Sequence, residues 1–242
     1  MKPDVLYEDN HLIAIYKPAG ILTQGDKSGD ANIMDEVKKY LKEKYHKTGK
    51  VFLGLLHRLD RPVSGIILFA KTSKGASRPS EQFRNQTVEK IYHALVLGKP
   101  KQNRGVLVNY LRKDEKRKKA MILKDKKPGA NLAKLFYEVV ASNIELSRSE
   151  SEDGDEVKLH RPYSLLKIQI KTGKFHQIRA QLSSIGCPIL GDIKYGAPFA
   201  LPQKIIALSA TSLSFQLATK KEKKEISVPI PSIWEKYTKS KR

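Results

Sequence analysis

The spacing of apolar positions divides the chain into many short strands and one clear helix. Runs rich in branched or aromatic residues, each bounded by turn residues, predict strands. Between residues 30 and 47, Met34, Val37, Leu41 and Tyr45 recur at helical spacing with charged residues between them, which predicts an amphipathic helix. The predicted strands are 5–7, 12–16, 51–56, 66–70, 88–97, 132–141 and 163–170, with further strands over 205–217.

Three further segments have weaker patterns. Residues 77–86 predict a short helix, although Pro79 is expected only in a first helical turn. The basic stretch 113–127 surrounds a short apolar run, 120–123, that indicates one strand of a hairpin. Residues 147–156 are acidic and serine-rich, which is typical of a loop.

The order of these elements predicts the fold class. Many strands, few helices and no regular strand–helix alternation favour an α+β fold with a mixed, largely antiparallel sheet flanked by helices. We expect a single domain over residues 1–242 with a basic tail at about 236–242.

Composition points to a polyanionic partner. Lysine and arginine exceed aspartate and glutamate by 46 to 25, a formal net charge of +21, which favours nucleic acid over a merely solvated surface. No apolar run approaches the ~20 residues that span a bilayer, and residues 1–4 lack the apolar core of a signal peptide. Cys187 is the single cysteine, and the six histidines have no spaced ligand partners, so no metal site is expected. We expect a soluble, cytoplasmic monomer.

The segment His57 to Gly65, HRLDRPVSG, places one carboxylate between two predicted strands. Pro62 and the Ser-Gly pair after it indicate a loop. Asp60, flanked by Arg58 and Arg61, should stay ionised, ready to act as a base, a nucleophile or an electrostatic anchor. From spacing alone, an ion pair that braces the turn is the more frequent role of such a residue.

Two other segments carry candidate chemistry. In the strand 90–98, alternation puts Tyr92 on one face with the other even-numbered residues, a position that also suits ordinary core. Residues 172–179, TGKFHQIR, read as a turn that enters a helix ended by Gly186. Arg179 lies on the polar face of that helix, where most arginines are only solvated.

These segments together resemble a known family. HRLDRPVSG is similar to the active-site motif of the RluA-type RNA pseudouridine synthases, and segments 8–22, 90–98 and 172–192 resemble the family's other motifs in the same order. The resemblance covers about residues 5–230. It implies an RNA pseudouridine synthase that isomerises specific uridines of ribosomal or transfer RNA after base flipping, and it implies no cofactor.

The resemblance also implies a role for each matching residue. Asp60 would be the essential catalytic residue, acting as nucleophile or as base, and Arg179 would pair with it. Arg58 would fill the space that the flipped uridine leaves. Tyr92 would stack on the uracil, and Ile189 would form the apolar wall opposite.

Departures and rival functions remain open at this point. Lys174, Ala180-Gln181 and Ser209 differ from the usual family residues, and no N-terminal S4-type RNA-binding domain is expected. The first rival is a non-catalytic RNA-binding or ribosome-assembly protein that keeps the fold. An aspartate-dependent glycosidase is less supported, because such enzymes normally use two carboxylates. Residues 112–127 and the tail are predicted to contact the RNA backbone.

Overall fold

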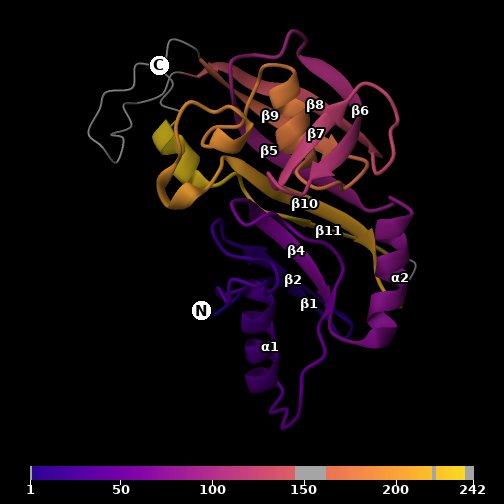
Figure 1. Cartoon of the computed structure of the whole chain (residues 1–242). Helices are drawn as coiled ribbons and strands as arrows, with labels where there is room; N and C mark the ends of the chain where they lie inside the picture. The colour runs from indigo at the N-terminus through magenta and orange to yellow at the C-terminus, as the bar shows by residue number, and fades with distance from the viewer. Residues whose placement is uncertain (1, 145–161, 220–221, 238–242) are drawn as a thin grey trace. The chain divides into compact units, whose positions relative to one another are not determined.

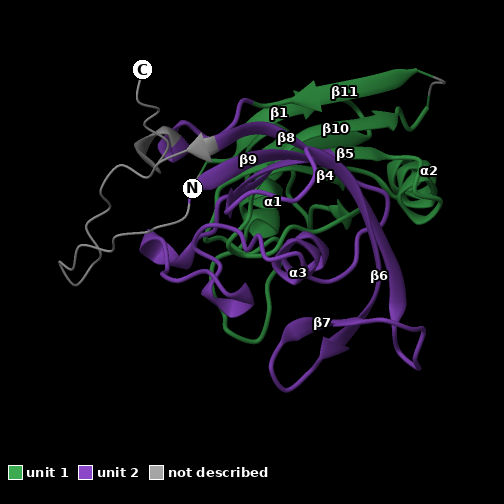
Figure 2. Cartoon of the chain, turned by 90° about the horizontal axis from the view of Figure 1, so that it is seen from above, with its two compact units in different colours: residues 1–90, 210–228 green, residues 91–209, 229–242 purple. Residues whose placement is uncertain are grey.

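The structure, a computed structural model, describes residues 2–144, 162–219 and 222–237. It divides into two compact units, one of residues 1–90 and 210–228 and the other of residues 91–209 and 229–242 (Figures 1 and 2). The expectation of a single domain stays a prediction. The predicted acidic loop at 147–156 and the end of the basic tail lie outside the described residues.

Unit 1 is a sheet with a helix on each face. Its strands follow the order β1-β2-β4-β10, with β3 paired to β4 and β11 to β10, and the pairs β1–β2, β2–β4, β3–β4 and β10–β11 are antiparallel. The elements are β1 (Asp4–Glu8), β2 (Leu12–Lys17), α1 (Ile33–Lys44), β3 (Gly54–Leu55), β4 (Ser64–Ala70), α2 (Ser73–Arg84), most of β10 (Leu208–Gln216) and β11 (Lys223–Ser227).

The predicted helix at 30–47 is confirmed as α1, with shorter bounds. The Asn32 side chain caps its start by accepting from the Asp35 backbone N–H, and Tyr45 at its end is exposed. Val37 and Leu41 pack with Ile67 and the other alternate residues on one face of the sheet. The opposite face carries a second apolar cluster, against which Phe83 of α2 packs.

Unit 2 is a longer antiparallel sheet with one helix packed on it. Its strands follow the order β5-β9-β8-β6-β7, and β8–β9, β6–β8 and β6–β7 are antiparallel. Helix α3 packs through Ala180 against Ala120 and Ala133 of the sheet. Strands and helices in this arrangement confirm the α+β class. The elements are most of β5 (Glu89–Leu97), β6 (Arg104–Asp114), β7 (Lys119–Leu123), β8 (Asn131–Ile144), β9 (Tyr163–Ile170), α3 (Gln177–Ser184) and the short 3₁₀ helices η1 (Ile193–Tyr195), η2 (Pro202–Lys204) and η3 (Ser232–Tyr237).

The structure differs from the sequence-based expectations in several places. The strand expected at 51–56 is only the two residues of β3, and β11 was not predicted. Strand β6 was not predicted; it forms because β7 and β8 pair with its two edges. Helix α2 begins earlier than expected, at the Thr72 cap, so that Pro79 lies within the helix and is buried. Ser64 and Gly65 begin β4 instead of closing a turn.

Gly65 enters the sheet because only glycine fits there. Its φ is +121°, and a Cβ at this position would lie 2.3 Å from the carbonyl oxygen and 2.4 Å from the nitrogen of Ala210 in β10. Gly65, which the local sequence pattern assigns to a turn, therefore lies where β4 and β10 approach each other closely.

Candidate active site

Asp60 lies in the loop between β3 and β4, and this loop is tied to the segment after β2. The Val63 N–H donates to the Asp60 carbonyl at 3.0 Å, which closes a turn around the aspartate. The Thr23 hydroxyl donates to the Leu59 carbonyl at 2.8 Å and accepts from the Leu59 N–H at 3.2 Å. Hydrogen bonds at Leu59 and at Val63 therefore fix the backbone on either side of Asp60, while Asp60 itself is partly exposed.

A buried lysine joins the same two segments. Lys17 has no exposed surface, and its ammonium donates to the carbonyls of Pro18 (2.9 Å), Ile21 (2.8 Å) and Arg61 (3.3 Å). Burial lowers the pKa of Lys17 to about 7, and the charge of Asp60 opposes that shift. The sequence analysis gave Lys17 no role. Its place in the first family-like motif was the available signal.

The two arginines beside Asp60 differ in their surroundings. Arg61 donates through Nε to the Gly20 carbonyl at 2.9 Å and through Nη1 to the Asp30 carboxylate at 2.6 Å. The Gly20 N–H in turn donates to the Arg61 carbonyl at 2.8 Å. Arg61 thus binds the loop of the first motif. Both Arg58 and Arg61 are exposed.

His57 anchors the start of the Asp60 loop. β3 pairs with β4 at Gly54 and Leu55 and then leaves it; beyond that point the imidazole Nε2 of His57 accepts the Leu68 N–H at 3.0 Å. The ring stacks on Phe83, with centroids 4.8 Å apart. Burial and the nearby charge of Lys90 lower the pKa of His57 to about 3, so the ring is neutral.

Unit 2 carries Tyr92 and Ile189 on adjoining segments. Tyr92 lies in β5, and its side chain is buried together with those of Lys90, Ala94 and Val96, which confirms the predicted face. Ile189, fully buried, pairs with Val96, and the residues on either side of it hydrogen-bond to the same strand.

Arg179 makes a two-point ion pair within unit 2. Its Nε donates to one carboxylate oxygen of Asp192 at 2.7 Å and its Nη2 to the other at 2.8 Å. Both side chains are almost completely buried, at 7% and 1% exposed, where such a pair fixes the guanidinium firmly. The guanidinium carbon lies 5.0 Å from the centre of the Tyr195 ring. Asp192 belongs to a segment that the sequence analysis matched to the family without assigning it a role.

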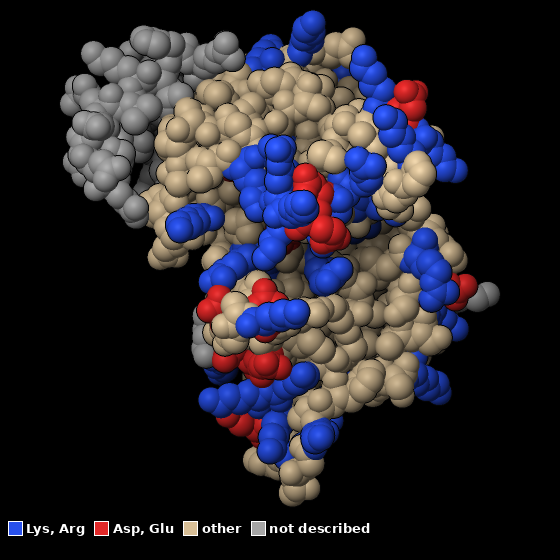
Figure 3. Space-filling view, viewed as in Figure 1, with Lys and Arg blue, Asp and Glu red and all other residues tan. Residues whose placement is uncertain are grey.

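The pairing of Arg179 with Asp60 stays a prediction, as do the roles of Arg58, Tyr92 and Ile189. Among the residues that the structure describes, no group of three histidine, cysteine, aspartate or glutamate side chains could hold a metal ion. Lysine and arginine side chains form scattered patches over the visible face of the molecule, with fewer acidic side chains among them (Figure 3).

Comparison with known proteins decides the family. Residues 11–184, well over half of the chain, match the RNA pseudouridylate synthase family. The chain belongs to this family. The matched range contains Asp60, Tyr92 and Arg179, while Ile189 lies just beyond it.

Individual RNA pseudouridylate synthases are similar along most of this chain. Ribosomal large subunit pseudouridine synthase C of Rickettsia prowazekii is 33% identical over 228 residues, which cover 93% of this chain and 68% of that protein. tRNA pseudouridine synthase C of Haemophilus ducreyi is 36% identical over 199 residues, 81% of this chain and 75% of that protein. The chain is therefore an RNA pseudouridine synthase, an isomerase, as its motifs predicted.

The solved structures agree with this family assignment in their fold. Human RNA pseudouridylate synthase domain containing 4 has a TM-score of 0.73 to this chain at 24% identity, and the likeness covers 96% of this chain and 90% of that one. The predicted fold is confirmed. No helix among the described residues of this pseudouridine synthase is long and apolar enough to cross a membrane.

Proposed function

We propose that this pseudouridine synthase modifies specific uridines of ribosomal or transfer RNA, with Asp60 as its catalytic residue. The names of its relatives in Rickettsia prowazekii and Haemophilus ducreyi support these two RNA classes. The net charge of +21 suits either one. We further propose that it acts as a cytoplasmic monomer.

The reaction requires an ionised carboxylate at a fixed place. Isomerisation breaks the N1–C1′ bond of uridine, rotates the base and joins C5 to C1′; N1 gains a proton and C5 loses one. Asp60 would act either by attack on C1′ or by removal of the 2′ hydrogen to give a glycal. Both routes need the charged form and a precise position, because an error of about 1 Å can lower the rate 100-fold.

The observation that carries the assignment of Asp60 is the way its loop is held. Lys17, Thr23 and Arg61 join that loop to the segment after β2 by hydrogen bonds of 2.8–3.3 Å. The positive charge of Lys17 also favours an ionised Asp60. A loop fixed this firmly around a partly exposed carboxylate suits a catalytic group.

The remaining roles follow the family resemblance. Arg58 would occupy the space of the flipped uridine, and Tyr92 and Ile189 would contact the uracil. Arg179 would orient Asp60, and its two-point bond to Asp192 would keep the guanidinium in one orientation. Tyr92, or a water near it, would accept the C5 proton.

The test is tritium release from RNA labelled at C5 of uridine, taken from cells that lack the protein. The wild type should release tritium, whereas Asp60→Asn should release none and bind RNA with unchanged affinity. Asp4→Asn is the matched control, because it removes an exposed carboxylate of unit 1 outside the Asp60 loop and should release tritium at the wild-type rate. Release at the wild-type rate by Asp60→Asn would overturn the assignment, and free uracil in the products would indicate a glycosidase.

A further inference from the structure

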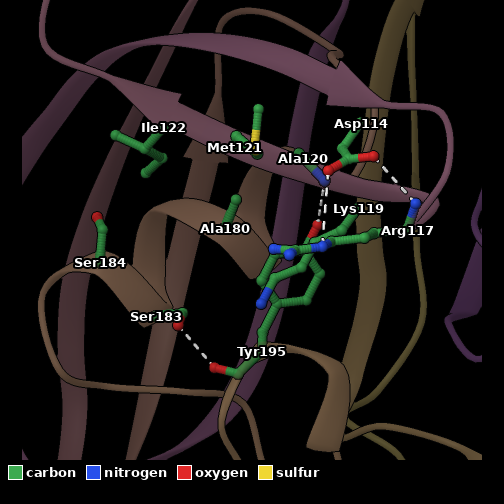
Figure 4. Close-up of a pocket in the computed structure, with 10 residues that line it drawn as sticks. All are labelled: Asp114, Arg117, Lys119, Ala120, Met121, Ile122, Ala180, Ser183, Ser184 and Tyr195. Atoms are coloured by element: carbon green, nitrogen blue, oxygen red, sulfur yellow. Dashed lines mark hydrogen bonds and ion pairs between the residues drawn. The ribbon is translucent and has the colours of Figure 1, made fainter.

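Unit 2 contains a pocket of about 260 Å³ between the β6–β7 hairpin and helix α3 (Figure 4). Its floor is apolar and comes from Ala120 and Ile122 of β7 and Ala180 of α3. The pocket is smaller than the roughly 300–1,000 Å³ sites that hold drug-sized ligands, so one ring system is the largest group that suits it.

The rim of this pocket is mostly cationic. Arg117 and Lys119 line it, and they belong to the segment 112–127, which has nine lysine or arginine residues against three acidic ones. One carboxylate, that of Asp114, also lines the pocket and accepts the Arg117 backbone N–H at 3.0 Å. The Asp114 carboxylate would repel a small anion, whereas it could accept hydrogen bonds from the N–H groups of a neutral ring.

The walls of the pocket are fixed before any ligand binds. The Tyr195 hydroxyl accepts the Ala120 N–H at 2.6 Å and lies 2.9 Å from Nδ1 of His176. The Ser183 hydroxyl donates to the Tyr195 carbonyl at 2.6 Å, so α3, η1 and β7 are joined at one point. Figure 4 shows Tyr195 between the strand and the helix. A pocket built in advance loses little conformational entropy on binding.

We propose that this pocket binds one unpaired nucleobase of the RNA substrate other than the target uridine, with the adjoining phosphates on Arg117 and Lys119. The flat apolar floor would take the ring, Asp114 would accept from its N–H groups, and the rim cations would neutralise the backbone. The proposal rests on RNA being the substrate. It makes the pocket a contributor to the choice of RNA site.

Tyr195, which lines the pocket, also contacts Arg179. The Lys119 ammonium lies 4.8 Å from the centre of the Tyr195 ring, and the Arg179 guanidinium carbon lies 5.0 Å from it. A phosphate that draws Lys119 away from the Tyr195 ring would leave Arg179 as the cation over that ring. A nucleobase bound in the pocket would therefore affect the contacts of Arg179, the residue expected to orient the catalytic aspartate.

The test measures binding of fluorescent 12-nucleotide single-stranded RNAs by anisotropy, beside matched oligomers in which all bases are absent. Ser184→Tyr fills the pocket from an exposed position on its rim without changing charge, and Ser184→Ala is its control. Ser184→Tyr should weaken binding of normal RNA about fivefold to 100-fold, the effect of one stacked base, and leave binding of the abasic RNA unchanged. Ser184→Ala should behave as the wild type with both.

A second pair of variants tests the phosphate contact without touching the floor. Arg117→Gln and Lys116→Gln each remove one cation from the same hairpin turn, and only Arg117 lines the pocket. Arg117→Gln should cost severalfold more affinity for normal RNA than Lys116→Gln does.

The outcomes separate this proposal from the proposed function. The pocket proposal would be overturned if Ser184→Tyr lowered the affinity for normal and abasic RNA equally, or lowered neither. It would also be overturned if the wild type did not bind RNA, or bound normal and abasic RNA equally well. Tritium release by the wild type would then still establish the reaction. Base-dependent binding without tritium release would keep the pocket and refute the function.

Discussion

Replacing His57 tests how the start of the Asp60 loop is held. His57→Phe keeps a ring to stack on Phe83 but has no acceptor for the Leu68 N–H, which then lies unsatisfied. Leaving a buried donor unpaired costs about 1–3 kcal/mol of the free energy of unfolding. For a chain of this size a loss of about 2 kcal/mol lowers the melting temperature by about 4–8 °C.

His57→Gln separates the hydrogen bond from the ring. The glutamine Oε1 reaches the place of Nε2 and can accept the Leu68 N–H, whereas the shorter amide of His57→Asn cannot. We expect kcat for tritium release to fall 10-fold to 100-fold in the Phe and Asn variants, with RNA affinity unchanged, and to recover largely in His57→Gln. Equal activity of all three variants would refute the hydrogen bond as the cause.

The pH dependence gives an independent measure. The pKa of His57 is about 3 in the folded protein and near 6.5 when unfolded, so the unfolded state binds the extra proton between these values. The contribution of His57 to stability is complete above pH 6.5 and is lost as pH falls toward 3. When the pH is lowered from 7 to 5, the free energy of unfolding measured in urea should fall by about 1–2 kcal/mol more for the wild type than for His57→Gln. Parallel pH profiles would contradict this reasoning.

Three further changes have expected outcomes. Gly65→Ala should destabilise unit 1 by more than about 4 kcal/mol, because its Cβ meets the Ala210 backbone; unchanged unfolding by urea would contradict this. Asp192→Asn should cost about 3–5 kcal/mol and lower kcat, since it leaves the Arg179 charge buried without this carboxylate; thermal melts and tritium release check it. Lys17→Met should cost about 1–3 kcal/mol by removing the donor to three carbonyls, and a urea midpoint equal to that of the wild type would count against it.

Much of the fold could be predicted from local pattern, and the remainder depended on distant partners. The strands β5 and β9 and the helix α1 follow from periodicity, because each buries a regular face. β6 pairs with neighbours on both sides, and it alternates exposed and partly buried residues from Arg104 to Asn109, a strand signal that the sequence analysis did not use. Gly65 was assigned to a turn because no local signal reveals a strand arriving from residue 210.

The candidate site divides in the same way. Asp60 could be singled out because its motif is contiguous, and the position of its loop between β3 and β4 is confirmed. Lys17 and His57 act through hydrogen bonds to residues 44 and 11 positions away, so their contributions needed coordinates. The role of Asp192 likewise could not be predicted, because it depends on its ion pair with Arg179 of α3.

The discontinuity of unit 1 has a consequence for the order of synthesis. The loop of Asp60 leaves the ribosome early, yet the strand that packs on Gly65 belongs to residues 210–228, which are made much later. Contacts so distant in sequence form slowly, and until β10 arrives the edge of β4 lacks a partner that it has in the finished sheet. A nascent chain can therefore form the loop contacts of Lys17, Thr23 and Arg61 before the strand that packs on Gly65 has been made.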